Sequence, residues 1–252
     1  MIKENRKYTK SICVVGTPQW SQMPEDVVGN EIKEENVMYS FHFYAASHSN
    51  LRPNLTSVCN KIPMFITEWG IGSALELENV IDTVEAKTWL HYFKLNKITW
   101  SYWSFCDKGT TASLLDSGAC AEKAWTKVNS TGAFMKHFMV TDAKMEQDKT
   151  FDIYKSETDK DGTMIKLVFS TKIKSISAND ALKFSAKING KPVSGIILKL
   201  TPDSTGLDII LSQKIKLGDK VEMSYNGNTI KSRDGYALIK YTNAVILNTV
   251  PP

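Results

Sequence analysis

The first part of the chain alternates apolar runs with segments of helical character. Each run is apolar along most of its length, which is typical of strands buried on both faces in a parallel sheet. Strand, helix and strand in succession imply right-handed crossovers and a parallel arrangement. The runs are residues 11–16 (SICVVG), 37–44 (VMYSFHFY), 63–69 (PMFITEW) and 98–105 (ITWSYWSF).

One helix is predicted between the last two of these runs. Ser73 and Glu76 have the spacing of a capping box, which marks a helix start. The pattern predicts that the helix ends near Asn96, in a left-handed cap before the next strand. The apolar residues at helical spacing after the capping box are Leu77, Val80, Ile81 and Val84.

The pattern changes near residue 140 to short strand-like runs separated by turns. Residues 221–225 alternate apolar with polar positions, and Asn189-Gly190 is a strong hairpin signal. About 100 residues of such runs fit an immunoglobulin-like β-sandwich. The polar segment 139–150 lacks periodicity and is the expected junction, which gives two domains, 1–142 and 150–252.

Composition supports an ordinary globular protein of 252 residues, 42% hydrophobic, with a net charge of +4. No block of Lys and Arg stands apart, so no nucleic-acid partner is expected. No apolar stretch is long enough to cross a membrane, and the amino-terminal residues do not form a signal peptide. All six tryptophans precede residue 140, so the two regions differ in surface chemistry as well as in pattern.

The four cysteines show neither paired CxxC spacing nor a His-Cys cluster. A structural metal is therefore not expected, and nothing in the sequence calls for another cofactor. Cys13 lies within an apolar run and is expected to be an inert buried thiol. Whether two cysteines pair remains open from the sequence.

Polar and aromatic residues follow the carboxyl ends of all four apolar runs. Active sites of parallel α/β barrels are built at that end of the strands. Each of these residues alone has an ordinary structural explanation. Polar and aromatic residues at the ends of all four strands together favour an active site. The residues are Trp20 and Gln22, His42 and Tyr44, Glu68 and Trp69, and Trp103, Asp107 and Lys108.

Glu68 ends an apolar run, where a charge is costly without a partner or a role. A carboxylate nucleophile beside a tyrosine, a histidine and aromatic platforms suits glycoside hydrolysis, in which sugars stack on tryptophan and glutamate attacks the anomeric carbon.

Four motifs, VVGTPQWSQ, VMYSFHFYAASH, FITEWG and ITWSYWSFCDK, together closely resemble the carboxyl-terminal half of bacterial endoglucanases of glycoside hydrolase family 5. The resemblance covers roughly residues 7–140. It implies a partial (β/α)8 barrel with strands 5 to 8 only, so the expected fold class is α/β plus all-β.

The resemblance also implies roles for individual residues. Glu68 matches the nucleophile, and His42 and Tyr44 match the pair that brackets it, with Tyr44 hydrogen-bonding the carboxylate. Trp103 matches the platform under the sugar at the cleavage point, and Trp20 and Lys108 match residues that contact neighbouring sugars. The sequence DKGTT departs from relatives that carry an acidic residue there.

A larger departure concerns the acid/base glutamate, which the family places after an asparagine at the end of the fourth strand. Asn30-Glu31-Ile32 is the lookalike here, but it falls in a polar segment and not at a strand end. Retaining hydrolysis needs two carboxyl groups about 5 Å apart. We therefore expect a fragment of a retaining endo-β-1,4-glucanase that is inactive alone, with open sheet edges that call for the missing half-barrel or a second chain.

The region 150–252 resembles, more loosely, the immunoglobulin-like modules of bacterial secreted enzymes. It has no tryptophan, so a spacer or stability role is expected rather than cellulose binding. The alternatives are a non-catalytic glucan-binding or adhesion fragment, and a product without an independent role. The expected partner is a β-1,4-glucan, and the expected location of the full-length parent is secreted or at the cell surface.

Overall fold

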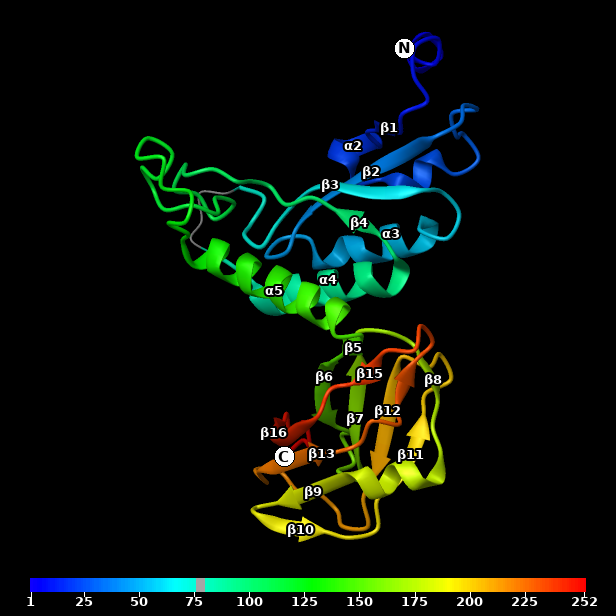
Figure 1. Cartoon of the computed structure of the whole chain (residues 1–252), viewed down its shortest axis with the longest axis vertical. Helices are drawn as coiled ribbons and strands as arrows, with labels where there is room; N and C mark the ends of the chain where they lie inside the picture. The colour runs from blue at the N-terminus through cyan, green and yellow to red at the C-terminus, as the bar shows by residue number, and fades with distance from the viewer. Residues whose placement is uncertain (76–79) are drawn as a thin grey trace. The chain divides into compact units, whose positions relative to one another are not determined.

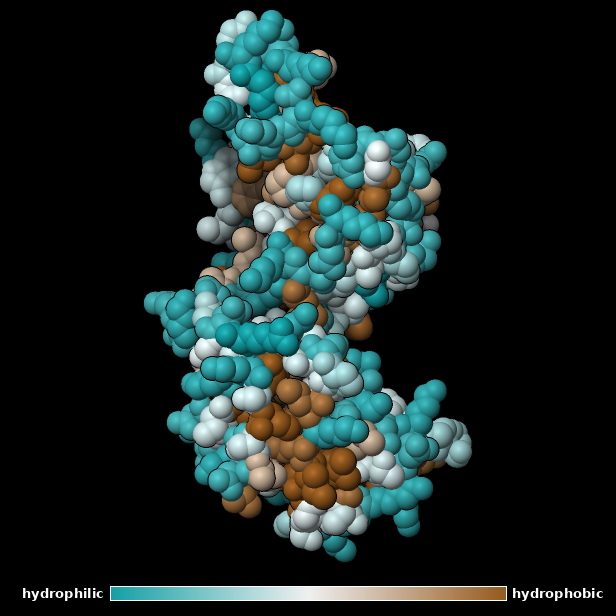
Figure 2. All heavy atoms as spheres, turned by 90° about the vertical axis from the view of Figure 1, so that its right-hand side faces the viewer, coloured by the Kyte–Doolittle hydropathy of each residue, from teal (hydrophilic) through white to brown (hydrophobic). Residues whose placement is uncertain are grey.

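A computed structural model describes residues 1–75 and 80–252. The chain divides into two compact units, Met1–Val140 and Thr141–Pro252. The spheres of Figure 2 show apolar side chains in brown that interrupt the hydrophilic surface of both units.

The first unit is built on one parallel sheet (Figure 1). Its strands stand in chain order, β1-β2-β3-β4, and each pairs in parallel with the next, which confirms the predicted arrangement. The strands are β1 (Cys13–Val15), β2 (Val37–Tyr44), β3 (Met64–Gly70) and β4 (Thr99–Trp100).

The fourth apolar run is regular over only two residues, although a strand was expected over 98–105. Its backbone nevertheless continues along β3, because the N–H of Ser101 donates to the carbonyl of Ile66 (2.8 Å) and the N–H of Trp103 donates to the carbonyl of Trp69 (2.9 Å). The segment that leads to Trp103 is therefore held against β3 without forming a complete ladder.

Helices connect these strands and cover one face of the sheet, where α3 and α4 lie in Figure 1. The helical elements are α1 (Ile2–Asn5), α2 (Pro18–Ser21), the 3₁₀ turns η1 (Pro24–Val27) and η2 (Ser49–Leu51), α3 (Arg52–Val58), α4 (Thr83–Asn96) and α5 (Ser130–Gln147).

The core under this face is aromatic. The Phe43 ring of β2 stacks on Trp89 of α4 at 4.0 Å and on Trp69 of β3 at 5.4 Å between centroids. Phe41 and Phe93 are also fully buried beside them. The side chains buried against the helices therefore define one face of β2 and β3, and the opposite face points away from the helices.

The start predicted for the long helix is wrong. Helix α4 begins at Thr83, and Asp82 caps it by accepting from the N–H groups of Val84 and Glu85. Ser73 lies outside the helix, while Glu76 and Leu77 of the expected start lie outside the described residues. An aspartate that caps two N–H groups is a stronger start signal than the spacing of apolar residues before it.

The predicted end of this helix at Asn96 is confirmed, but the left-handed residue is Lys97, with φ of 55°. Helix α5 covers most of the expected junction 139–150, and the boundary between the two units follows Val140. One further expectation is wrong. Cys13 is half-buried rather than buried, because β1 is an outer strand of the sheet.

The second unit consists of β-strands arranged in three four-stranded sheets. The sheets have the orders β10-β9-β13-β16, β11-β12-β7-β6 and β5-β15-β14-β8. The pairings are antiparallel except for β5 with β15, which is parallel.

The strands of the second unit are short. They are β5 (Thr150–Phe151), β6 (Ile153–Thr158), β7 (Met164–Phe169), β8 (Ile173–Ser175), β9 (Phe184–Ile188), β10 (Lys191–Val193), β11 (Ile197–Leu200), β12 (Gly206–Ile210), β13 (Val221–Tyr225), β14 (Lys231–Ser232), β15 (Ala237–Leu238) and β16 (Tyr241–Ile246), with a 3₁₀ turn η3 (Ala178–Lys183).

The hairpin and the alternating strand are confirmed. Ile188 pairs with Lys191 across a two-residue turn, and both turn residues have positive φ, 51° for Asn189 and 77° for Gly190. In β13, residues 221, 223 and 225 are buried and the two between them are not. One core cluster takes side chains from all three sheets, so the unit encloses its own hydrophobic interior.

Candidate active site

The polar face of β2 carries Ser40, His42 and Tyr44, which alternate with the buried Phe41 and Phe43. Successive side chains of a strand point to opposite faces of a sheet. Since the phenylalanines pack against helix α4, the three polar residues lie on the face opposite the helices. This face is where Glu68 of the neighbouring strand is found.

A β-bulge in the pairing of β2 with β3 places Glu68 there. Ser40 pairs with Phe65 and His42 with Glu68, so Phe41 alone faces the two residues Ile66 and Thr67. A bulge of this kind re-aims the side chains that follow it. As a result, Thr67 and Glu68 both contact polar side chains of β2, while Ile66 and Trp69 on either side are fully buried.

The Glu68 carboxylate has two neighbours on β2. The Tyr44 hydroxyl donates to Oε1 at 2.9 Å, as predicted, and Nδ1 of His42 lies 4.0 Å from Oε2. The Glu68 side chain is 29% exposed and Tyr44 only 8%. The carboxylate is thus oriented by a buried phenol and still open to a ligand.

His42 is held by its other nitrogen. Nε2 lies 2.7 Å from the Thr67 hydroxyl, which in turn lies 2.5 Å from the hydroxyl of Ser40. Burial lowers the pKa of His42, and the nearby Glu68 charge opposes that shift. The imidazole is therefore neutral at pH 7 and can exchange hydrogen bonds without adding a positive charge beside the carboxylate.

Thr67 and Ser40 were missed from the sequence. The period-2 alternation back from Tyr44 and His42 could have identified Ser40. No comparable signal existed for Thr67, because regular alternation would turn it away from the face that Glu68 occupies. Only the bulge places both residues together.

Trp103 and Tyr44 meet at Gly70, the last residue of β3. A Cβ at Gly70 would lie 2.9 Å from the Tyr44 ring and 3.6 Å from the Trp103 carbonyl oxygen. Gly70 therefore permits a close approach that another residue would block. The Trp103 side chain is 44% exposed, and the Trp103–Ser104 peptide bond is cis. Trp103 thus lies at the carboxyl end of β3 with its indole partly accessible.

Trp20 is presented by an unusual turn after β1. Gln19, Trp20 and Ser21 have φ values of 54°, 54° and 63°, in the left-handed region that side chains disfavour. Such a conformation costs about 1–2 kcal/mol per residue and is concentrated at functional sites. The Trp20 side chain is 81% exposed. The backbone is thus strained at the turn that exposes the Trp20 ring to solvent.

The remaining predicted residues differ in position. Trp69 is fully buried and belongs to the aromatic core, so it is not a ligand-facing residue. The carboxylate of Asp107 accepts from the N–H of Cys120 at 2.9 Å, and the backbone N–H donors lower its pKa. Lys108, next to it, is exposed. Asp107 therefore organises the loop, and Lys108 projects from it.

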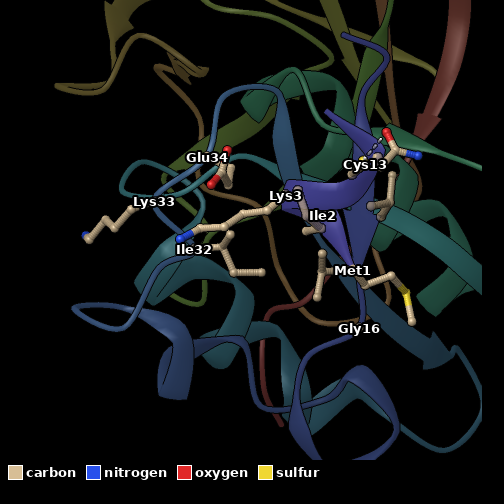
Figure 3. Close-up of a pocket in the computed structure, with 11 residues that line it drawn as sticks. Met1, Ile2, Lys3, Cys13, Gly16, Ile32, Lys33 and Glu34 are labelled. Atoms are coloured by element: carbon tan, nitrogen blue, oxygen red, sulfur yellow. Dashed lines mark hydrogen bonds between the residues drawn. The ribbon is translucent and has the colours of Figure 1, made fainter. Parts of the chain in front are cut away.

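A hollow of about 980 Å³ beside β1 is separate from this constellation (Figure 3). It is lined by residues 1–3, 5, 13–16 and 32–34, most of them apolar. The contact shown within it joins the Cys13 thiol to the Asn5 side chain at 3.9 Å. The hollow therefore marks the outer edge of the sheet and contains none of the predicted site residues.

Within the described residues, no group of three His, Cys, Asp or Glu side chains is placed to hold a metal ion. All four cysteines are free thiols. Over the same part of the chain, no helix combines the length and apolar character needed to cross a membrane.

The geometry around Glu68 suits nucleophilic attack by a carboxylate. One oxygen is fixed by a phenol, a neutral imidazole lies near the other, and partly exposed tryptophans are available for an apolar ligand face. Glu31 is engaged elsewhere, because its carboxylate accepts from Gly29 N–H and from Lys33 in the segment before β2. In parallel strands, that segment precedes the amino end of β2, opposite to the end where Tyr44 lies.

Comparison with known proteins agrees with this chemistry. Residues 1–109 match the family model "Cellulase (glycosyl hydrolase family 5)". The match includes β1 to β4 and every predicted site residue. It supports a cellulase-type segment with a (β/α)8 barrel type of fold, to which a parallel sheet with intervening helices corresponds.

Curated relatives and one solved structure extend the likeness to about half of the chain. An endoglucanase of Clostridium saccharobutylicum is 33% identical over 131 residues, which are 50% of this chain and 29% of that protein. Endoglucanase A of Evansella cellulosilytica is 30% identical over 130 residues, 50% of this chain and 26% of the relative. A structure from Cytophaga hutchinsonii is 30% identical with a TM-score of 0.51, covering 56% of this chain and 50% of the other.

The chain thus spans between a quarter and a third of the length of these two curated relatives. The homology supports a function in cellulose degradation at the level of the family. The activity of the whole relatives comes to this chain only as a proposal.

Proposed function

We propose that the first unit is a segment of a retaining endo-β-1,4-glucanase in which Glu68 is the nucleophile. The observation that carries this proposal is the hydrogen bond from Tyr44 to a partly exposed carboxylate at the carboxyl end of β3. In this proposal the four strands are part of a (β/α)8 barrel. The ligand is a β-1,4-glucan, which is found outside cells, so the parent protein would act secreted or at the cell surface.

The roles proposed for the other residues are those that the resemblance implies. Tyr44 and His42 orient the carboxylate, Trp103 supports the sugar at the reacting carbon, and Trp20 and Lys108 contact neighbouring sugars. The Glu68 carboxylate would attack the anomeric carbon and form a glycosyl ester while the bond to the leaving oxygen breaks. No cofactor takes part in this step.

Among the described residues, the Glu68 carboxylate accepts a hydrogen bond from Tyr44 and lies close to His42. We propose that the second carboxyl group, which would protonate the leaving oxygen, is absent from this chain. Retaining hydrolysis needs such a group about 5 Å away. We propose that this chain alone hydrolyses glucan negligibly, since loss of general acid–base catalysis typically costs about a hundredfold or more.

A substrate whose leaving group needs no proton tests the nucleophile separately from the missing acid. 2,4-Dinitrophenyl 2-deoxy-2-fluoro-β-cellobioside releases dinitrophenolate directly, so Glu68 should still form the ester. Mass spectrometry of the digested full chain should find the adduct on the peptide that contains Glu68, with Glu31→Gln as the matched control that labels normally. Labelling at another carboxyl group, or none, would reject the nucleophile assignment.

A non-catalytic glucan-binding or adhesion role is the second candidate. It is favoured by the exposed rings of Trp20 and Trp103, because stacking on sugars needs no catalytic group. Glucan binding without any covalent labelling would support it over the enzyme segment.

For the second unit we propose an immunoglobulin-like sandwich that serves as a spacer or stability module. Its own enclosed core and its lack of tryptophan support this role over glucan binding. Affinity electrophoresis of the chain in hydroxyethyl cellulose tests it: Tyr and Phe substitutions confined to residues 150–252 should leave the retardation unchanged.

A further inference from the structure

Phe105 and Trp125 form an exposed aromatic pair that the proposed site does not use. Their ring centroids are 6.3 Å apart with an angle of 31° between the planes. Phe105 is 60% exposed and Trp125 is 53% exposed. Single exposed apolar side chains are common, but two large rings kept side by side in solvent are a feature of binding surfaces.

The backbone that carries Phe105 is fixed by hydrogen bonds. Residues 104–106 run beside residues 112–115, with the N–H of Ser104 donating to Ala112 (2.9 Å) and the N–H of Leu115 donating to Cys106 (3.0 Å). Phe105 lies between these two contacts. The ring is therefore presented by an ordered segment rather than by a free loop.

The backbone before and after Trp125 is fixed as well. Upstream, the N–H of Cys120 donates to the Asp107 carboxylate, and downstream the N–H of Asp116 donates to the carbonyl of Lys127 (3.0 Å). Leu115 and Val128 form an isolated antiparallel bridge. These contacts bring two segments twenty residues apart together, so the aromatic pair is pre-formed before any ligand arrives.

The pair continues the proposed glucan site along the chain. Phe105 follows Trp103 by two residues, and the Trp103 backbone is bonded to Trp69 at the end of β3. In Figure 1 the segment 105–129 is the green loop at the left of the first unit, beyond the end of β3. The pair therefore lies on the loop that extends from the carboxyl end of the sheet.

We propose that Phe105 and Trp125 form an outer subsite for a β-glucan chain whose inner sugars occupy the site at Glu68 and Trp103. The inference rests on the proposed function. A β-linked glucose unit presents flat C–H faces that pack on aromatic rings and equatorial hydroxyls that need polar partners. Exposed Lys108 and Lys123, on the same loop, supply donors for those hydroxyls.

The length of the ligand provides the test. Calorimetry on the full chain with cellotriose and cellohexaose compares a sugar that fills the inner site with one that reaches further. Trp125→Ala and Phe105→Ala should each lower cellohexaose affinity about two- to tenfold and leave cellotriose affinity unchanged. Trp125→Phe should keep most of the affinity, and Tyr8→Ala, which removes another exposed aromatic ring of this unit, should change neither sugar.

Trp103→Ala separates this inference from the proposed function, because it should weaken both sugars. Unchanged cellohexaose binding in Trp125→Ala and Phe105→Ala, with weaker binding in Trp103→Ala, would overturn the outer subsite alone. Equal loss of both sugars in Trp125→Ala would also overturn it, since Trp125 would then shape the inner site. Wild-type chain that binds neither sugar would overturn both proposals.

Discussion

The Tyr44 hydroxyl donates to the Glu68 carboxylate at 2.9 Å across two neighbouring strands. The pairing register places Tyr44 opposite Gly70 and His42 opposite Glu68, so the tyrosine reaches back by two positions. This is possible because Gly70 leaves room for the ring. A buried phenol with a fixed partner is a rigid donor to the oxygen that it holds.

Tyr44→Phe should slow covalent labelling of Glu68 about tenfold or more while leaving the fold intact. The change removes one hydrogen bond to a charged group, which is worth about 1.5–3 kcal/mol. Labelling rates by mass spectrometry measure the effect. Tyr39→Phe, on the core face of the same strand, is the matched control. An unchanged rate in Tyr44→Phe would show that the hydrogen bond does not serve the nucleophile.

Much of the sheet could be predicted because parallel strands buried on both faces leave long apolar runs. Strand β2 has the predicted bounds, 37–44. The site residues on β2 and β3 were identified from motifs, and the contact of Tyr44 with Glu68 was implied by the resemblance to family 5 endoglucanases. These features depend on local pattern and on the order of the strands.

What the sequence could not reveal depends on non-local pairing. The bulge opposite Phe41 turns Thr67 and Glu68 to the same face, against the period of two that a strand pattern assumes. The contact of Phe105 with Trp125 depends on a loop closed by Asp107 and Cys120, which no spacing rule encodes. The start of α4 was misplaced because apolar spacing extended upstream of the true cap at Asp82.

Limited proteolysis should leave a resistant fragment that begins near residue 150. The edge strands of the sheet in the first unit are short: β1 has three residues and β4 has two. At the β1 edge, Ile12 is 63% exposed and Val14 is 42% exposed. The second unit encloses a core from three sheets. Mass spectrometry of the digest identifies the fragment. A resistant piece that contains the tryptophans would show the opposite order of stability.

Acid should destabilise the first unit through His91 of α4. Burial lowers the pKa of His91 to about 4 from an ordinary value of 6.5. The folded state therefore disfavours the protonated imidazole, and stability is lost as the pH falls from about 6.5 to 4, by up to about 3 kcal/mol.

His91→Gln should flatten this pH dependence, whereas exposed His137→Gln should not. Urea unfolding followed by tryptophan fluorescence reports on the first unit alone, because all six tryptophans lie before residue 140. An equally steep pH dependence in His91→Gln would assign the effect to other groups.

The second unit should respond to pH in the opposite direction through Asp152. Burial raises the pKa of this carboxyl group, which lines a hollow of about 200 Å³ together with Tyr241. The folded state disfavours the ionised form, so the stabilising contribution is present below the ordinary pKa of 3.8 and is lost as the pH rises through the folded value.

Asp152→Asn should therefore stabilise the second unit at pH 7 and have little effect near pH 3. Urea unfolding followed by NMR signals of Ile165 and Ile209, in the core of this unit, provides the measurement. Asp161→Asn, in the turn before β7, serves as the control. Destabilisation by Asp152→Asn at pH 7 would mean that the ionised carboxylate is favoured in the folded unit.

Glu68→Gln should separate chemistry from binding. The amide keeps the shape of the side chain and can still accept a hydrogen bond from Tyr44, but it is not a nucleophile, so labelling by the fluorinated cellobioside should disappear. Stacking on Trp103 and Trp20 does not need the charge, and cellohexaose affinity measured by calorimetry should stay within about twofold of the wild type. Trp103→Ala should have the opposite effect. It should weaken cellohexaose binding, while Glu68 should still be labelled when the fluorinated cellobioside is present at saturating concentration. If Glu68→Gln abolished binding as well, the carboxylate would have to be assigned to ground-state recognition of the sugar rather than to attack on its anomeric carbon.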